Sequence, residues 1–274
     1  MASATRTRRP KMTPEERTAY HAEQRAKLDQ ITSSVYTVLH TPAVWRSLLA
    51  LTARLEVEDV SRGPVNCVAI LGQLPTATDV RGKREWKKIG RYPAKGTTAL
   101  RVWGPVRGRR ADESTEGTEP QTGAETEAPD TTGERVQVFA AVPTYDISQT
   151  AGDDYTPEPR PAADPMACAR RLLTMLREPL DLEDREGPSA LRTVLAALAA
   201  EQFEGTPQYI AGQNAAEAAS AAHLAALILG ITPGMAPAPD LGAIVTGPRM
   251  TPAIKESAIR VIEAGRGFAA LARS

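Results

Sequence analysis

The sequence has 274 residues, enough for one large domain or two small ones, and its 33 Lys and Arg residues balance 33 Asp and Glu residues. The balance is uneven along the chain, because residues 1–110 hold 21 basic and 9 acidic side chains whereas residues 111–160 hold 2 and 12. No apolar run reaches the roughly 18 residues that a membrane span needs, and the two cysteines are isolated, so we expect a soluble, cytoplasmic protein without disulfides.

The first helix is predicted to begin after Thr13, behind a basic arm over residues 1–12 that has no hydrophobic periodicity and that we expect to be disordered. Thr13 is a favourable N-cap residue, Pro14 suits the first helical turn, and Glu16 completes a capping box. Apolar residues recur at helical spacing only from Leu28 onwards. We therefore expect the later half of this helix to pack on the domain and its charged first half to be solvated.

Two more helices are expected before the first strand. Thr41 and Pro42 repeat the threonine-proline start, and leucines at helical spacing follow them. The apolar run within residues 61–74 fits a buried strand or a helix by periodicity alone, and a serine and a proline near its start favour the helix. For Asn66 in this run we expect a hydrogen bond to nearby backbone rather than a functional role.

A strongly basic segment over residues 80–96 surrounds Trp86 and leads into a strand predicted over residues 97–106. The alternation of this strand places Arg101 and Trp103 on one face and small or apolar residues on the other, which is typical of a sheet with one wet face. Cations neutralise phosphates, and an exposed aromatic ring is a platform for an unstacked base. The segment therefore suits single-stranded nucleic acid.

The ordinary alternative is that Lys and Arg on an exposed surface only solubilise the protein and that a neighbouring Trp belongs to the core. For Trp86 this alternative is open, because its indole could pin the basic turn to the core, and Trp103 or Tyr92 would then be the better stacking residue. The residues that we predict to contact nucleic acid are Lys83, Arg84, Trp86, Lys87, Lys88, Arg91, Tyr92, Lys95, Arg101 and Trp103.

An acidic insertion over residues 111–134 separates this strand from a second one predicted over residues 136–142. The insertion is rich in Glu, Thr, Gly and Pro, and with so little apolar surface to bury we expect it to be a disordered loop. The two strands then form an antiparallel pair whose hairpin turn the insertion replaces. Residues 153–165 are rich in Pro and Asp and are predicted to be a linker.

The second half of the chain, residues 166–274, is predicted to be helical. A zinc peptidase needs an HExxH pair on one helix, and here His21, His40 and His223 are isolated. The sequence also lacks a phosphate-binding loop and a nucleophile with a neighbouring base. We therefore expect no catalytic residue, no bound metal, no cofactor and no enzymatic activity. The predicted helices cover residues 166–177, 188–203 and 215–229, and a last one begins at residue 251.

Several short motifs occur along the chain, namely Ile70–Thr78, Trp86–Arg91, Lys95-Gly96, Gly104–Val106 and Tyr145–Thr150. Their order and spacing resemble the ArdC-type antirestriction proteins of plasmids and phages, well over residues 13–152 and weakly near the C-terminus. The resemblance implies a single-stranded DNA-binding domain over residues 13–152, followed by a metallopeptidase-like region. It places the family's glutamate zinc ligand at Glu217, but without HExxH this region is degenerate. The chain also departs from the family after Gly96, where relatives carry an acid-base pair.

The predicted fold class is α+β, with N-terminal helices on a small, mainly antiparallel sheet and a reduced, all-helical C-terminal region over residues 166–274. We predict a sequence-nonspecific single-stranded DNA-binding protein of antirestriction type that protects or accompanies mobile-element DNA. The alternative is a pseudo-metallopeptidase whose C-terminal helices bind a protein partner. Neither prediction involves a membrane.

The acidic insertion is expected to compete with DNA for the neighbouring cations, because it carries charge of the same sign as phosphate. Replacing Ala111–Gly133 by a short Gly-Ser turn should tighten binding to a single-stranded oligonucleotide at low salt, and screening should remove the gain at high salt. A variant that keeps the length but changes its acids to amides separates charge from length. Equal affinity of all three proteins at low ionic strength would show that the insertion has no effect on binding.

Overall fold

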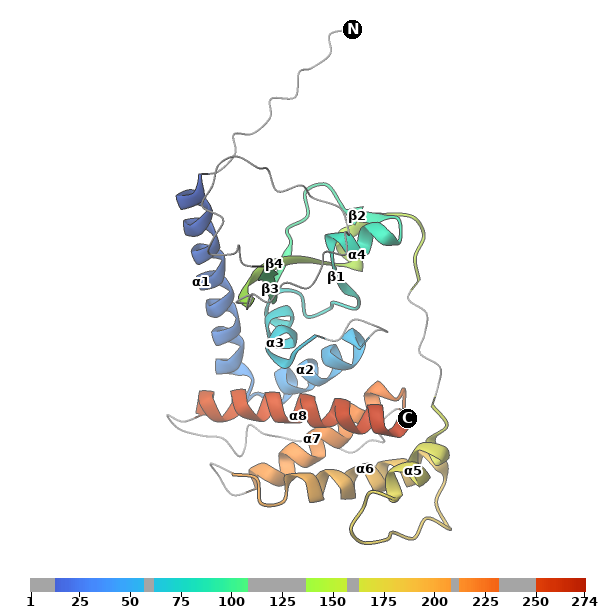
Figure 1. Cartoon of the computed structure of the whole chain (residues 1–274). Coiled ribbons are helices and arrows are strands. Elements are labelled where there is room, and N and C mark those ends of the chain that lie inside the picture. Colours follow the sequence, from blue (N-terminus) through green and yellow to red (C-terminus); the bar gives the residue numbers. More distant parts are fainter. Residues whose placement is uncertain (1–12, 57–61, 108–136, 157–162, 208–211, 232–249) are drawn as a thin grey trace, which may run out of the picture.

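The structure is a computed structural model that describes residues 13–56, 62–107, 137–156, 163–207, 212–231 and 250–274 (Figure 1). The predicted basic arm over residues 1–12 and the predicted acidic loop over residues 111–134 lie outside the described residues. Figure 1 shows the sheet and three N-terminal helices stacked on a layer of C-terminal helices. In the described part of the chain, no helix combines the length and the apolar character that crossing a membrane requires.

The three N-terminal helices begin at Thr-Pro or Gly-Pro pairs, as the sequence predicts for the first two. Helix α1 (Pro14–Val38) follows Thr13, whose side chain accepts from the Glu16 backbone while Glu16 accepts from the Thr13 backbone, and this confirms the capping box. Helix α2 spans Pro42–Leu55, and α3 spans Pro64–Gln73, so the run over residues 61–74 is a helix.

The main sheet has three antiparallel strands in the order β1-β4-β3. Strand β3 (Leu100–Arg107) pairs with β4 (Gln137–Asp146) along its whole length, and β1 (Val80–Gly82) pairs only with the last three residues of β4. The basic turn predicted after β1 is instead a six-residue helix, α4 (Lys83–Lys88). Strand β2 (Arg91–Pro93) pairs with β5 (Thr150–Gly152) in a separate ribbon, and the short helix η1 (Ile147–Gln149) precedes β5.

The outer edge of β3 is paired with side chains of α3 rather than with another strand. The Asn66 amide donates to the Trp103 carbonyl at 2.8 Å and accepts from the Trp103 N–H at 2.7 Å. Two residues earlier on β3, the Gln73 amide donates to the Arg101 carbonyl and accepts from the Arg101 N–H, both at 2.8 Å. The expected hydrogen bond of Asn66 to backbone is therefore confirmed, although it reaches across 37 residues rather than to nearby backbone.

The C-terminal half is helical, as predicted, and it shares its hydrophobic core with the first half. One cluster of buried side chains runs from Val35 in α1 through α2 and α3 to Ala272 at the end of the chain. The buried Trp45 indole donates to the Ser220 hydroxyl at 3.0 Å and so joins α2 to the second half. The predicted α+β class is confirmed. The four helices are α5 (Pro165–Leu173), α6 (Gly187–Phe203), α7 (Gln213–Ile228) and α8 (Met250–Arg273).

The amide pairing at the edge of β3 gives a stability prediction. Changing Gln73→Ala leaves the N–H and carbonyl of Arg101 without these partners, which should lower the free energy of unfolding by about 1–3 kcal/mol. Urea unfolding of the full chain measures this loss. The matched control is Gln30→Ala on the exposed side of α1, which should change stability by less than about 0.5 kcal/mol. Equal effects of the two changes would contradict a special role for the edge pairing.

Candidate nucleic-acid interface

Helix α4 presents a ridge of four cations above a buried indole. The side chain of Glu85 accepts from the Gly82 N–H at 2.6 Å and starts the helix. Trp86 is fully buried and its Nε1 donates to the Tyr145 carbonyl at 2.8 Å, which fixes which side of the short helix faces inward. Within the described residues the cations of the ridge make no ion pair or hydrogen bond. They are Lys83, Arg84, Lys87 and Lys88, all exposed.

A buried polar network supports this ridge from below. The guanidinium of Arg81 donates to both carboxylate oxygens of Asp79, at 2.8 and 3.0 Å, and to the Tyr155 hydroxyl at 2.7 Å. It also lies 5.5 Å from the ring centres of both Trp86 and Tyr155, a cation–π geometry. Its hydrogen bonds to Asp79 raise the pKa of Arg81, and burial raises the pKa of Tyr155. Arg81 is therefore a structural cation rather than a free one.

The β2–β5 ribbon continues the ridge and carries an exposed aromatic ring. The side chain of Arg91 donates to the hydroxyl of Thr150 at 2.9 Å and to its carbonyl at 3.0 Å, so this guanidinium holds the ribbon together. Tyr92, the next residue, is 48% exposed. Lys95 is exposed in the following turn, where Gly96 has a φ of +88° that favours glycine.

The motif that follows β4 holds the loop before β1 against the sheet. The carboxylate of Asp146 is buried and accepts from the backbone N–H groups of Thr78, Asp79 and Ser148, at 2.7, 3.1 and 3.0 Å. Gln149 donates to the Thr98 carbonyl at 2.8 Å. The polar residues of Tyr145–Thr150 therefore position the strands that carry the ridge.

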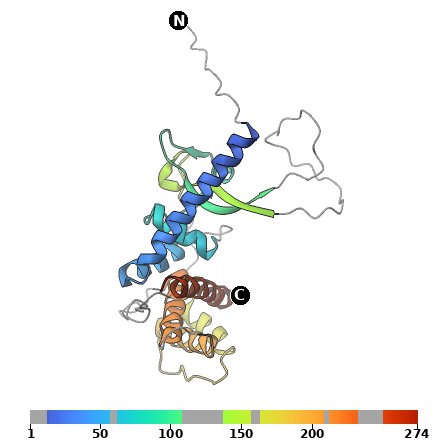
Figure 2. The same cartoon turned by 90° about the vertical axis from the view of Figure 1, so that its left-hand side faces the viewer.

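The sheet face that carries Arg101 and Trp103 is partly covered by α1, which Figure 2 shows crossing the strands. Arg101 donates to the Tyr20 hydroxyl at 2.8 Å, and the Arg25 guanidinium lies 5.6 Å from the Trp103 ring centre. Trp103 also packs against the buried cluster of Leu28, Ala69 and Ala141. The first half of α1 is exposed at most positions, as predicted, and Tyr20 and Arg25 add two contacts with the sheet from this exposed part.

The structure therefore divides the predicted contact residues into three groups. The prediction that Trp86 contacts nucleic acid is wrong, because a fully buried indole cannot stack on a base. Arg91, Arg101 and Trp103 are partly buried and already engaged within the protein. The remaining six are exposed and lie on α4, on β2 and in the turn after it, namely Lys83, Arg84, Lys87, Lys88, Tyr92 and Lys95.

Sequence reasoning missed Arg81 and Tyr155 beneath the ridge, and Tyr20 and Arg25 on α1. Tyr155 lies 74 residues from Arg81 in a segment rich in Pro and Asp, and no local pattern links the two. Strand β1 has only three residues, too few to show the alternation of polar and apolar residues that would have singled out Arg81. Arg25 could have been noticed as a cation one turn before the first buried residue of α1, Leu28.

Glu217, where the resemblance places a zinc ligand, is fully buried and engaged by three side chains. Arg260 donates to both of its carboxylate oxygens, at 2.8 and 2.6 Å. Ser257 and Gln213 donate to Oε1 at 2.5 and 2.8 Å. The positive charge that a metal ion would bring is thus supplied by the guanidinium, and the residues at this position do not fit a metal. His223 on the same helix is half-buried, and burial lowers its pKa.

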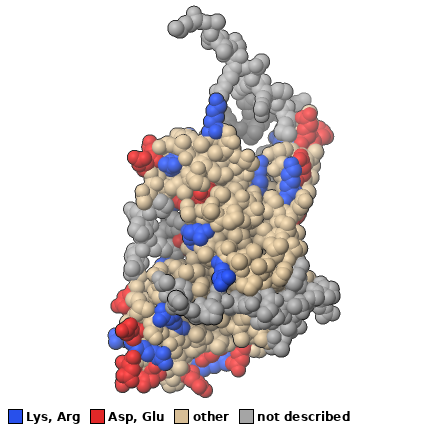
Figure 3. Space-filling model, turned by 180° about the vertical axis from the view of Figure 1, so that it is seen from behind, with Lys and Arg blue, Asp and Glu red and all other residues tan. Residues whose placement is uncertain are grey.

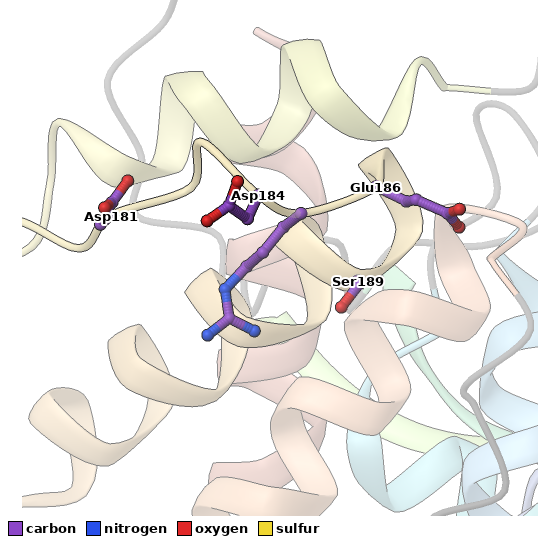
Figure 4. Close-up of a pocket in the computed structure, with 5 residues that line it drawn as sticks. Asp181, Asp184, Glu186 and Ser189 are labelled. Atoms are coloured by element: carbon purple, nitrogen blue, oxygen red, sulfur yellow. The ribbon is translucent and has the colours of Figure 1, made fainter.

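Elsewhere in the C-terminal half, a surface hollow of about 590 Å³ lies beside the start of α6 (Figure 4). Its acidic side chains are Asp181, Asp184 and Glu186, and in Figure 4 Asp181 and Glu186 lie at opposite ends of it. In the part of the chain that the structure describes, no three His, Cys, Asp or Glu side chains are grouped so that they could hold a metal ion. On the face shown in Figure 3, cations and carboxylates of the helical half lie side by side, as on an ordinary solvated surface.

The buried pair of Glu217 and Arg260 gives a second stability prediction. Changing Arg260→Ala leaves a buried carboxylate without its counter-ion and should lower the free energy of unfolding by about 3–5 kcal/mol. Calorimetry measures the change. The double variant Glu217→Gln, Arg260→Met, which removes both charges, should recover most of the loss. The control change Arg46→Ala, at an exposed arginine of α2, should have little effect. A loss in the double variant as large as in Arg260→Ala would contradict charge pairing as the cause.

No protein-family model and no curated protein matches the sequence. Among solved structures, the chain is similar to the metal-free crystal structure of the antirestriction protein ArdC from the R388 plasmid, with a TM-score of 0.50 and 13% identity over 90% of this chain and 97% of that one. The Mn(II)-bound crystal structure of the same protein aligns with a TM-score of 0.41 and 14% identity, over 82% and 97% of the two chains. At 13% identity the first similarity shows the fold alone, and this fold is ArdC-like, as the sequence motifs predict.

Proposed function

We propose that this protein binds single-stranded DNA without sequence preference, as an antirestriction-type protein that protects or accompanies the DNA of a plasmid or phage in the cytoplasm. The observation that carries the proposal is the row of exposed cations on α4, Lys83, Arg84, Lys87 and Lys88, which pair with no described residue and lie beside the exposed ring of Tyr92. The ArdC-like fold supports the class of function.

The chemistry of this surface matches a flexible polyanion. Unpaired Lys and Arg side chains release counterions from phosphates, and this term is independent of sequence. An exposed phenol ring stacks on any base, which adds about 1–3 kcal/mol per stacked base. Helix α4 and the β2–β5 ribbon are held by Trp86 and Arg91, so the backbone that carries the cations and the ring is already ordered, and binding has to order only their side chains.

For the helical half we propose a role without catalysis. Its support is Glu217, whose buried carboxylate is engaged by Arg260, Ser257 and Gln213, so that the guanidinium already supplies the positive charge a metal ion would bring. The second candidate function, a pseudo-metallopeptidase whose helices bind a protein partner, rests on the same observation. In both cases these helices also complete the core of the DNA-binding half.

The salt dependence of binding tests the proposal. Each phosphate contact to a single strand contributes about −0.7 to the slope of log affinity against log salt, so changing Lys87→Ala and Lys88→Ala together should flatten the slope by about 1.4. Fluorescence anisotropy with a labelled oligonucleotide measures both slope and affinity. The experiment uses the full chain, because the two halves share one core.

The matched control removes two exposed cations of the helical half, by Arg170→Ala and Lys255→Ala, and should leave the slope unchanged. In a companion variant, Tyr92→Ala should weaken binding at every salt concentration without altering the slope, because stacking releases no counterions. If the control pair flattens the slope as much as the α4 pair, the ridge is not the DNA surface. Tighter binding to duplex than to single-stranded DNA would contradict the choice of partner.

A further inference from the structure

Strand register places several aromatic and cationic residues on one face of the main sheet. Residues directly opposite each other in an antiparallel pair point to the same side. Arg81 is opposite Tyr145, and Arg101 is opposite residue 143, two positions before Tyr145 on the same strand. Trp103 and its partner Ala141 follow on the same face. This face therefore runs from Arg81 on β1, across β4, to Arg101 and Trp103 on β3.

Both ends of this face are covered, and its middle is open. At one end α1 covers Trp103 and Ala141 through Leu28 (Figure 2). At the other end Trp86 and Tyr155 enclose Arg81. Between them, Pro143 is exposed and Tyr145 is partly exposed, and the Tyr145 side chain makes no hydrogen bond with the described residues.

The open middle is continuous with the proposed DNA surface. The Tyr145 carbonyl accepts the hydrogen bond of the Trp86 indole, so Tyr145 lies directly beside α4. From β1 to β3 the face spans two strand spacings, about 10 Å, which one extended chain can cross. A partly exposed aromatic ring that stacks on no other ring of the described residues, midway between two groups of cations, is the arrangement found in platforms for single strands.

Charge favours the same occupant. The cations of α4 lie on one side of the open middle, and Arg101 and Arg25 lie on the other side. Figure 1 shows the same arrangement, with α1 to the left of the main sheet and α4 to its right. The carboxylate of Asp79, which binds Arg81 at one end of this face, is fully buried and neutralised by that guanidinium. A polyanion crossing from α4 to α1 therefore meets positive charge at both ends of its path.

We infer that single-stranded DNA crosses this face from the α4 ridge towards α1, with one base stacked on Tyr145. This inference rests on the proposed function and adds the route of the strand and a second base platform. The backbone of Tyr145 anchors α4, while its ring contacts the ligand.

Changing Tyr145→Ala in the full chain tests the route. The carbonyl that anchors Trp86 remains, and binding of a labelled oligonucleotide should weaken about 5- to 150-fold, the range that corresponds to one lost stacked base. The slope against salt should stay that of the original protein, and Tyr145→Phe should bind as the original protein does. Thermal unfolding of each variant confirms that the fold is kept.

A second measurement does not depend on a variant folding. Photocrosslinking of an oligonucleotide containing 5-iododeoxyuridine to the original protein should attach DNA to Tyr145, as identified by mass spectrometry. If Tyr145→Ala binds like the original protein, or crosslinks form only at Tyr92, the strand does not cross this face, although the Lys87 and Lys88 result can still support the proposed function. If the original protein binds no single-stranded DNA, both the proposed function and this route are wrong.

Discussion

The burial of Trp86 is the constraint on which the candidate interface depends. Helix α4 has six residues, far fewer than the roughly 12–15 that an isolated helix needs to be even marginally stable in water. Its stability must come from tertiary contacts, and the indole supplies them through the hydrogen bond to the Tyr145 carbonyl and the contact with the Arg81 guanidinium. Because the indole occupies the inward side of the helix, the four cations are held together on its outward side. All four remain in contact with water.

A second dependence links the two halves of the chain. The helices of the second half complete the core beneath α2 and α3, through contacts such as Trp45 with Ser220 and the ion pair of Arg266 with Glu56. These contacts are distant from α4, so they act on the interface only by keeping the first half folded. The buried pair of Glu217 and Arg260 joins α7 to α8, so these helices form a packed layer on which the first half rests.

Local signals predicted the fold well, and long-range contacts explain where the prediction stopped. The starts at Thr13 and Thr41 were recognisable because capping and proline act within one turn. Trp86 was wrongly placed among the contact residues. Whether an aromatic ring is exposed depends on what packs against it, here Arg81 and Tyr155, and the sequence pattern carries no such information. The alternation of β3 separated its faces correctly, yet periodicity could not show that α1 would cover Trp103. The cations of α4 were found by composition, and their common orientation came only from the structure.

The amides of Asn66 and Gln73 have a consequence for the behaviour of the protein in concentrated solution. They are seven residues apart on α3, about 10.5 Å along the helix axis, whereas their partners Trp103 and Arg101 are two residues apart on β3, about 6.8 Å. The longer reach of glutamine compensates for the mismatch, so a helix is able to imitate the hydrogen bonding of a strand at two consecutive sites. An outer strand with free backbone groups is a template on which other chains can polymerise. By occupying those groups at Arg101 and Trp103, α3 prevents this part of the sheet edge from acting as such a template.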